Sequence, residues 1–135
     1  MDLDRAREFI QSHHRAVVAV RRGDGGPQMS PVAVGLQDGC AVISSRETAF
    51  KVRHLRRDPR VWLCVVNDRF FGAWVLVEGT ATIVSLPEAM EMLVDYYRRI
   101  SGEHPDWDDY RKAMERDRRV LVRIAIERAG PDVAG

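Results

Sequence analysis

The chain has 135 residues and a formal net charge of +1, with 45% hydrophobic and 30% charged residues. These values are typical of one globular domain covering residues 1–135, and they exclude a disordered, collagen-like or coiled-coil chain. The near-neutral charge gives no general attraction to nucleic acid, and without a membrane-length apolar run or a signal-peptide core we expect a cytoplasmic protein.

Hydrophobic spacing and turn residues predict alternating blocks of strands and helices. In chain order, the predicted elements are a helix at 2–13, strands at 16–20, 28–36 and 40–44, a helix at 47–57, strands at 60–67 and 71–84, a helix after 85–88, a helix at 105–119 and a strand at 120–126. Ser85 and Glu88 match a capping box, in which the serine caps the helix and the glutamate follows three residues later. Gly79 interrupts the longest strand and predicts a bend or bulge there.

The pattern of turns indicates how the strands pair. Hairpin-length turns separate neighbouring strands, so we expect antiparallel pairing. Six strands with helices inserted late in the chain predict an α+β fold built on a small antiparallel barrel, because closure leaves no free sheet edge. The strands do not alternate regularly with helices, which argues against a doubly wound parallel sheet.

Motifs for nucleophilic, metal or dinucleotide chemistry are missing from the sequence. Cys40 and Cys64 lie within strand segments, where we expect small buried residues rather than nucleophiles. Four acidic residues around His104 leave a metal site open, although acids at a helix start are favoured without any metal. These residues are Glu103, Asp106, Asp108 and Asp109.

A basic segment after the third strand is the best candidate binding site. Ser44 and Ser45 precede it, and five lysines or arginines follow within residues 46–57. Serine hydroxyls, free N–H groups at a helix start and nearby cations bind phosphate oxygens, so the segment predicts an anion cradle. Lys51 and Arg53 diverge by about 200° on a regular helix, so they share one phosphate only if the helix is irregular or the ligand wraps around it. A solvated basic face is the alternative.

Aromatic residues gather around the hairpin that joins the two strands after this segment. They are Trp62, Phe70, Phe71 and Trp74. Such a cluster is typical of a core or a dimer interface, and the alternative is a wall that stacks on a flat ligand.

The order of these motifs resembles the pyridoxamine 5′-phosphate oxidase-like split β-barrel proteins. The chain is most similar to the branch described as coenzyme F420-dependent, or deazaflavin, oxidoreductases. The resemblance covers about residues 5–128 and is carried by segments 51–60, 77–81, 97–110 and 117–121, of which the helix-loop-helix stretch 97–110 is the long and specific one.

This resemblance implies a six-stranded antiparallel split β-barrel with peripheral helices, which forms a homodimer with cofactor sites at the interface. It implies that Lys51 and Arg53 hold the cofactor phosphate, with Ser44 and Ser45 nearby. His54 stands where the family often has asparagine, and Trp74 is expected to face the site from the partner chain. The strand along the flat ring of the cofactor corresponds to Gln28, Met29, Ser30, Pro31 and Val32.

The implied cofactor is F420, and FMN is the alternative, since both carry a phosphate. Reduced F420 donates a hydride from its C5 carbon to an activated C=C or C=N bond of a small substrate, and no side chain stands out as a catalytic proton donor. The other possible functions are an FMN-dependent oxidase or reductase and a non-catalytic flavin or haem module. A haem module needs an axial ligand, for which His54 and His104 are the candidates.

Overall fold

The computed structural model describes residues 1–130, which form seven strands and four helices. In chain order these are α1 (Leu3–Ser12), β1 (Arg15–Arg21), β2 (Pro27–Ala33), β3 (Gly35–Gln37), β4 (Cys40–Arg46), α2 (Phe50–Arg57), β5 (Arg60–Val66), β6 (Trp74–Val84), α3 (Met90–Ser101), α4 (Trp107–Arg116) and β7 (Arg119–Ala129). The strands join into one antiparallel sheet in the order β2-β1-β5-β6-β7-β4-β3.

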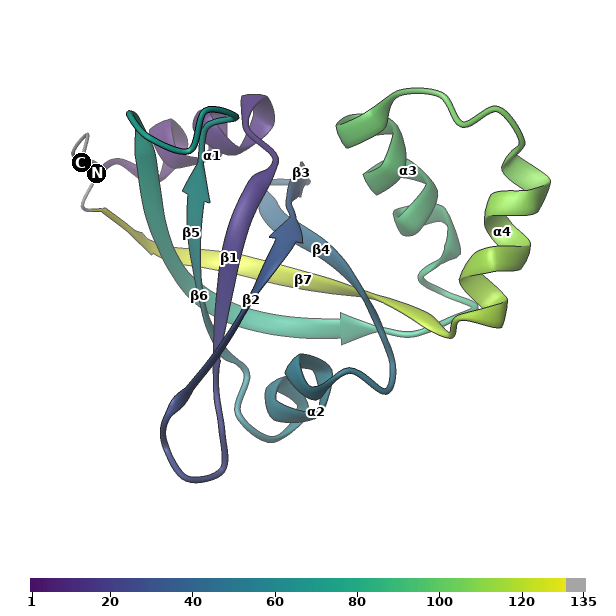
Figure 1. The fold of residues 1–135 in the computed structure, drawn as a ribbon, viewed down its shortest axis with the longest axis horizontal. Helices are drawn as coiled ribbons and strands as arrows, with labels where there is room; N and C mark the ends of the chain where they lie inside the picture. Colours follow the sequence, from purple (N-terminus) through teal and green to yellow (C-terminus); the bar gives the residue numbers. More distant parts are fainter. Residues whose placement is uncertain (131–135) are drawn as a thin grey trace.

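The sheet curls into a half-barrel, and its concave side holds the main hydrophobic core (Figure 1). In β1 and β5 every second residue is buried, as alternation along a strand that is buried on one side requires. Helix α1 closes one end of the half-barrel with Ala6 and Ile10, and α2 closes the other end with Val52 and Leu55 (Figure 1). The position of α2 at the barrel end brings the basic segment beside the last residues of β4.

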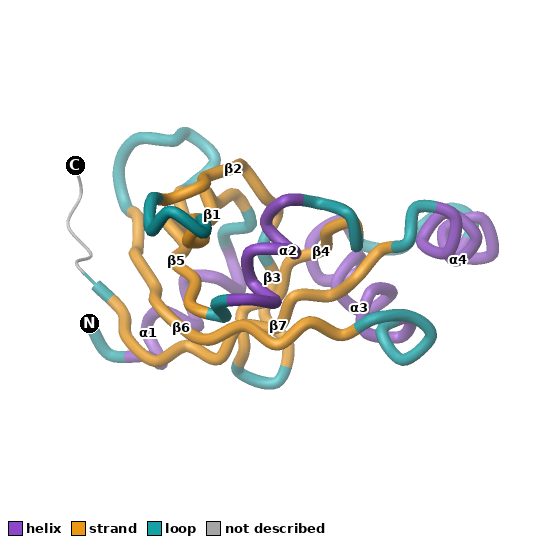
Figure 2. Tube along the Cα trace, turned by 90° about the horizontal axis from the view of Figure 1, so that it is seen from below, coloured by secondary structure: helices purple, strands orange, loops and turns teal. Residues whose placement is uncertain are grey.

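Helices α3 and α4 lie beside the barrel, where Figure 2 shows them at one end of the molecule. They pack on the outer side of β4 and β7 through Leu93, Val94 and Tyr110, which contact Val42 and Leu121. Strands β4 and β7 are therefore covered on both sides, by the barrel core and by the helix pair.

The predicted α+β barrel is confirmed, with one strand divided. The predicted strand at 28–36 becomes β2 and β3, because Val34 between them makes its hydrogen bonds elsewhere. Its N–H donates to the carbonyl of His14, and the Nδ1 atom of His14 lies 2.8 Å from the carbonyl oxygen of Val34. The bulge predicted at Gly79 is also confirmed, since the β6–β7 register shifts between Glu78 and Gly79.

The predicted capping box at Ser85 is wrong. Helix α3 begins at Met90, and its cap residue Ala89 makes no side-chain hydrogen bond. Residues 86–89 instead form a turn in which the N–H of Ala89 donates to the carbonyl of Ser85, so the serine lies too early to cap the helix. None of the helices in residues 1–130 has the length and apolar character needed to cross a membrane.

Candidate cofactor site

A small cavity lies where β4 ends, α2 begins and β7 starts. We call it the cradle; its volume is about 430 Å³, and its lining residues are Ser45, Arg46, Thr48, Ala49, Phe50, Lys51 and Arg119. The sheet pairing builds it, because β4 runs antiparallel to β7 and places Arg46 opposite Arg119. The short loop between β4 and α2 then returns Lys51 to the end of the same strand.

Of the three cations that line the cradle, Arg46 is exposed, and the other two, Lys51 and Arg119, are prepared for an anion. Lys51 is half-buried, and burial together with the neighbouring Arg119 lowers its pKa. The Nε atom of Arg119 is buried without a hydrogen-bond partner. Neither side chain forms an ion pair with any residue in the described range 1–130. An anion between them would relieve the repulsion and supply the missing acceptor.

The start of α2 adds to this positive character. Its cap residue, Ala49, offers no side-chain hydrogen bond, and its first turn holds no acidic residue. The first N–H groups of a helix have no partner within the helix, and the helix dipole favours negative charge at this end. The uncapped helix start therefore favours an anionic ligand, as Lys51 and Arg119 do.

The two predicted serines point to opposite sides of β4, because successive strand residues alternate. Ser45 is buried and lines the cradle. Ser44 lies opposite Leu121, on the side that α3 covers. The structure therefore brings Ser45 to the cradle with Lys51, but not Ser44.

Arg53 and His54 lie outside the cradle in this chain. Helix α2 is regular from residue 50 to 57, so the divergence expected between Lys51 and Arg53 is present. Arg53 is exposed, and its guanidinium lies 6.0 Å from the ring centroid of Phe50. The Nδ1 atom of His54 lies 3.2 Å from Nη1 of Arg57. Their roles at a cofactor remain predictions.

Strand β2, the predicted ring-binding strand, forms one edge of the sheet and also contacts β4. Its residues divide between two sides. Gln28, Ser30 and Val32 pair with core residues of β1 and face the barrel, whereas Met29 and Pro31 face outward. The Oε1 atom of Gln28 is buried and has no hydrogen-bond partner. Proline is tolerated in β2 because it is an edge strand.

The four aromatics near the β5–β6 hairpin do not form one cluster. Phe70 and Phe71 contact each other edge to face, and both are exposed. Trp62 lies between the guanidinium groups of Arg21 and Arg60, and its Nε1 donates to Glu78. Trp74 opposes Val66 at the start of β6, and its predicted contact across a dimer remains a prediction.

The remaining candidate groups have structural roles. Asp106 caps α4, and Glu103 pairs with Arg98 and accepts a hydrogen bond from Trp107. No group of three or more potential metal ligands occurs within residues 1–130. Cys40 and Cys64 are free and half-buried, and burial raises the pKa of Cys64, which keeps its thiol neutral.

Arg119 is a site residue that sequence reasoning missed. It stands at the start of the last strand, 68 positions after Lys51. Only the pairing of β4 with β7 brings the two together, and hydrophobic patterns do not specify strand order. The run Asp117-Arg118-Arg119 before a strand was the one local signal.

Comparison with known proteins adds the family. A family model described as pyridoxamine 5′-phosphate oxidase matches residues 3–130. The chain belongs to this family. The match spans nearly the whole chain, so it includes the half-barrel, the cradle and the helix pair.

Solved structures share the fold. The conserved hypothetical protein Rv2991 from Mycobacterium tuberculosis aligns with a TM-score of 0.79 and 27% identity, covering 99% of this chain and 85% of the other. A protein described as an F420 reductase aligns with a TM-score of 0.70 and 17% identity, covering 92% and 94%. A haem-binding protein from Mycobacterium smegmatis aligns with a TM-score of 0.73 and 20% identity, covering 94% and 52%. The fold therefore occurs with different ligands.

Proposed function

We propose that this protein is an F420-dependent oxidoreductase, which transfers a hydride between the deazaflavin and a small unsaturated organic molecule. The observation that carries the proposal is the cradle, where Lys51 and Arg119 lack ion-pair partners within residues 1–130. Membership of the pyridoxamine 5′-phosphate oxidase family and the likeness to an F420 reductase support a flavin-type cofactor.

Two ends of the cofactor would find partners among the residues present. Lys51, Arg119, the Ser45 hydroxyl and the first N–H groups of α2 would bind the phosphate. The buried Oε1 atom of Gln28 would accept a hydrogen bond from a ring N–H, because it has no other partner.

The protein's part in the reaction is to bind, orient and shield. When bound, F420 supplies hydride chemistry at its C5 carbon, and the substrate supplies an electrophilic carbon in an activated C=C or C=N bond. Residues of the cradle would hold the phosphate end of the cofactor, and β2 would bind its ring. No described side chain is assigned as a proton donor, so the proton would come from solvent.

We also propose that the chain forms a homodimer through the outer side of β2, β1, β5 and β6. The register aligns apolar, half-buried or exposed residues in rows across these strands. The rows contain Met29, Ala19 and Trp62, and next to them Pro31, Val17, Cys64 and Leu76. None of these residues belongs to either buried cluster, which leaves an apolar sheet face for a second copy.

A paired titration of the wild-type protein with F420 and FMN tests the cofactor. Tighter binding of F420 supports the proposal, and tighter binding of FMN replaces it with an FMN-dependent oxidase or reductase. Lys51→Ala should weaken the tighter complex by about 1–3 kcal/mol. Lys112→Ala is the matched control, because Lys112 is the other lysine and lies exposed on α4. Equal affinities of wild type and Lys51→Ala contradict the cradle.

Turnover distinguishes an enzyme from a binding module. Oxidation of reduced F420 should accelerate in the presence of an unsaturated acceptor and the wild-type protein. Cofactor binding without turnover across a panel of acceptors indicates a carrier or sensor. A Soret band after addition of haem points to the haem module, with His54→Ala and His104→Ala as the tests of the axial ligand.

A further inference from the structure

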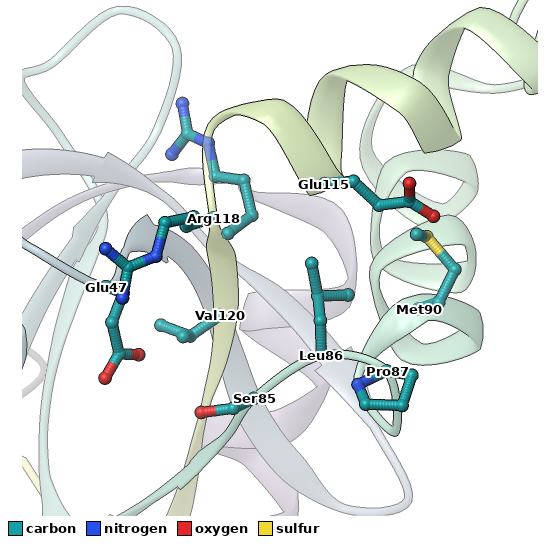
Figure 3. Close-up of a pocket in the computed structure, with 9 residues that line it drawn as sticks. Glu47, Ser85, Leu86, Pro87, Met90, Glu115, Arg118 and Val120 are labelled. Atoms are coloured by element: carbon teal, nitrogen blue, oxygen red, sulfur yellow. The ribbon is translucent and has the colours of Figure 1, made fainter.

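A second and larger cavity lies on the other side of Arg119 from the cradle. Its volume is about 740 Å³, within the range of small-molecule sites. The lining residues are Glu47, Ser85, Leu86, Pro87, Met90, Glu115, Arg118, Arg119 and Val120. Figure 3 shows Leu86 between Val120 on the last strand and Met90 and Glu115 on the helices. We call it the helix cavity.

Hydrogen bonds hold the walls of the helix cavity in place. The N–H of Glu47 donates to the carbonyl of Arg118 at 2.9 Å, which ties the loop after β4 to the start of β7. Arg56 pairs with the Glu47 carboxylate at 2.6 Å and reaches the Ser85 hydroxyl at 3.3 Å. These bonds connect three separate segments of the wall, so the cavity is largely formed before a ligand arrives.

The charges of the wall favour an anion. Glu47 is already neutralised by Arg56. Arg118 forms no ion pair with any residue among 1–130, and its backbone has a φ of 52°. Arg119 contributes the buried Nε without an acceptor. Glu115 is exposed on the helix side, so the lining holds two cations without ion-pair partners among residues 1–130 and one exposed carboxylate.

The base of the cavity is apolar. Leu86, Pro87, Met90 and Val120 provide its surface. An apolar base below a pair of arginines matches a ligand with an apolar body and an acidic end, because the body leaves water while the acid forms charge-assisted hydrogen bonds. A fully polar anion would leave the apolar base without contacts.

We propose that the helix cavity binds a small organic carboxylic acid with an apolar body, whose carboxylate pairs with Arg118 and Arg119. The site differs from the cradle but shares Arg119 with it, so the acid is tested on the protein without cofactor. Because Arg119 lines both cavities, it lies between the two ligands.

Isothermal titration of the full chain with 6-phenylhexanoate tests the proposal. Its amide, 6-phenylhexanamide, has the same body without the charge, and glutarate has the charge without the body. We expect the carboxylate to bind at least about tenfold more tightly than the amide and than glutarate. Equal binding of acid and amide, tighter binding of glutarate, or no binding of the acid at millimolar concentration overturns the proposal.

Variants locate the binding. Arg118→Gln should weaken the acid about tenfold, and Leu86→Trp should block it by filling the base. Arg116→Gln is the matched control, because Arg116 is exposed on α4, pairs with Asp117 and lies outside the cavity. Lys51→Met tests the other cavity. If this variant loses acid binding while Leu86→Trp binds the acid like the wild type, the ligand belongs to the cradle and the proposal is overturned. Circular dichroism checks that each variant is folded.

Discussion

Replacing Lys51 with methionine should weaken ligand binding without weakening the fold. Most buried side chains stabilise the fold as well as the complex with a ligand. The ammonium of Lys51 differs, because it is disfavoured in the folded chain without ligand. Burial and the neighbouring Arg119 lower its pKa, and it has no ion-pair partner among residues 1–130. Methionine keeps the apolar stem and removes the charge. The free energy of unfolding without ligand should therefore stay unchanged or rise.

The effect on binding follows from the number of cradle cations. Lys51 is one of three cations without ion-pair partners in the described cradle, so its loss removes one charge-assisted contact and leaves Arg46, Arg119, Ser45 and the helix start. One such contact is worth about 1.5–3 kcal/mol, or roughly 10- to 150-fold in the dissociation constant. For a thirtyfold loss, at a ligand concentration about 100 times the wild-type dissociation constant, the stabilisation falls from about 2.7 to about 0.9 kcal/mol.

Differential scanning calorimetry measures both quantities. With an unfolding entropy of about 2.1 cal/mol/K per residue, the ligand should raise the wild-type melting temperature by roughly 10 °C and that of the variant by roughly 3 °C. Lys51→Arg should restore most of the shift, and Lys112→Met should keep all of it. A variant that is less stable without ligand, yet shows the wild-type shift, would refute the reasoning, because Lys51 would then be a structural cation.

Protonation gives a further test of the same group. Because the folded pKa of Lys51 is lowered, its charge is lost at a lower pH than in an ordinary lysine. Anion binding to the wild type should therefore weaken as pH rises through this pKa. The Lys51→Arg variant should keep its affinity over the same range, since arginine stays charged.

Four more changes test other parts of the structure. Gln28→Leu removes the buried oxygen without a partner, so it should raise stability without ligand and weaken binding of the intact cofactor, but leave phosphate binding unchanged in a titration. Tyr110→Phe removes the hydrogen bond to the Leu93 carbonyl and should cost about 1–2 kcal/mol in urea unfolding. Burial raises the pKa of Tyr110 to about 12, so wild-type stability should be intact below pH 10 and fall by up to about 2.7 kcal/mol towards pH 12, more steeply than that of the variant. Gly79→Ala places a Cβ against the Ala125 carbonyl and should lower the free energy of unfolding by about 2 kcal/mol or more, whereas Gly23→Ala, which meets only ordinary contacts, should change it by less than about 0.5. Leu76→Glu on the outer sheet face should turn the proposed dimer into a monomer in sedimentation; a wild-type monomer that binds cofactor fully contradicts the dimer.

Local patterns predicted the features that depend on local physics. The apolar spacing located every helix, and Gly79 located the bulge because only glycine fits against the neighbouring strand. The strand at 28–36 was not predicted to divide, since the break at Val34 depends on His14, twenty residues earlier. The capping box failed because residues 86–89 form a turn and α3 begins only at Met90, which leaves Ser85 too early to cap it.

Long-range pairing also decides which cations are available for a ligand. Arg56 and Arg57 belong to the basic segment that the sequence predicts to bind an anion. In the structure Arg56 binds Glu47 and Arg57 donates to the Arg21 carbonyl, so both already have partners. Arg119, which the sequence did not assign to the site, keeps a buried Nε without a partner. Sequence can locate basic segments, but only the fold shows which of their charges are already paired.

The unpaired atoms of Gln28 and Arg119 lie on residues from the two parts of the proposed site. Each unpaired atom lowers the stability of the folded chain by about 1–3 kcal/mol, and the barrel does not require either atom for its own packing. One is an acceptor on the predicted ring strand and the other a donor in the cradle, which matches a ligand with a donor on its ring and an anionic tail. Inorganic phosphate can supply a partner only to the cradle, whereas an intact cofactor can supply both. The stabilisation by F420 or FMN should therefore exceed that by phosphate, and Gln28→Leu should remove the difference while Lys51→Met reduces both.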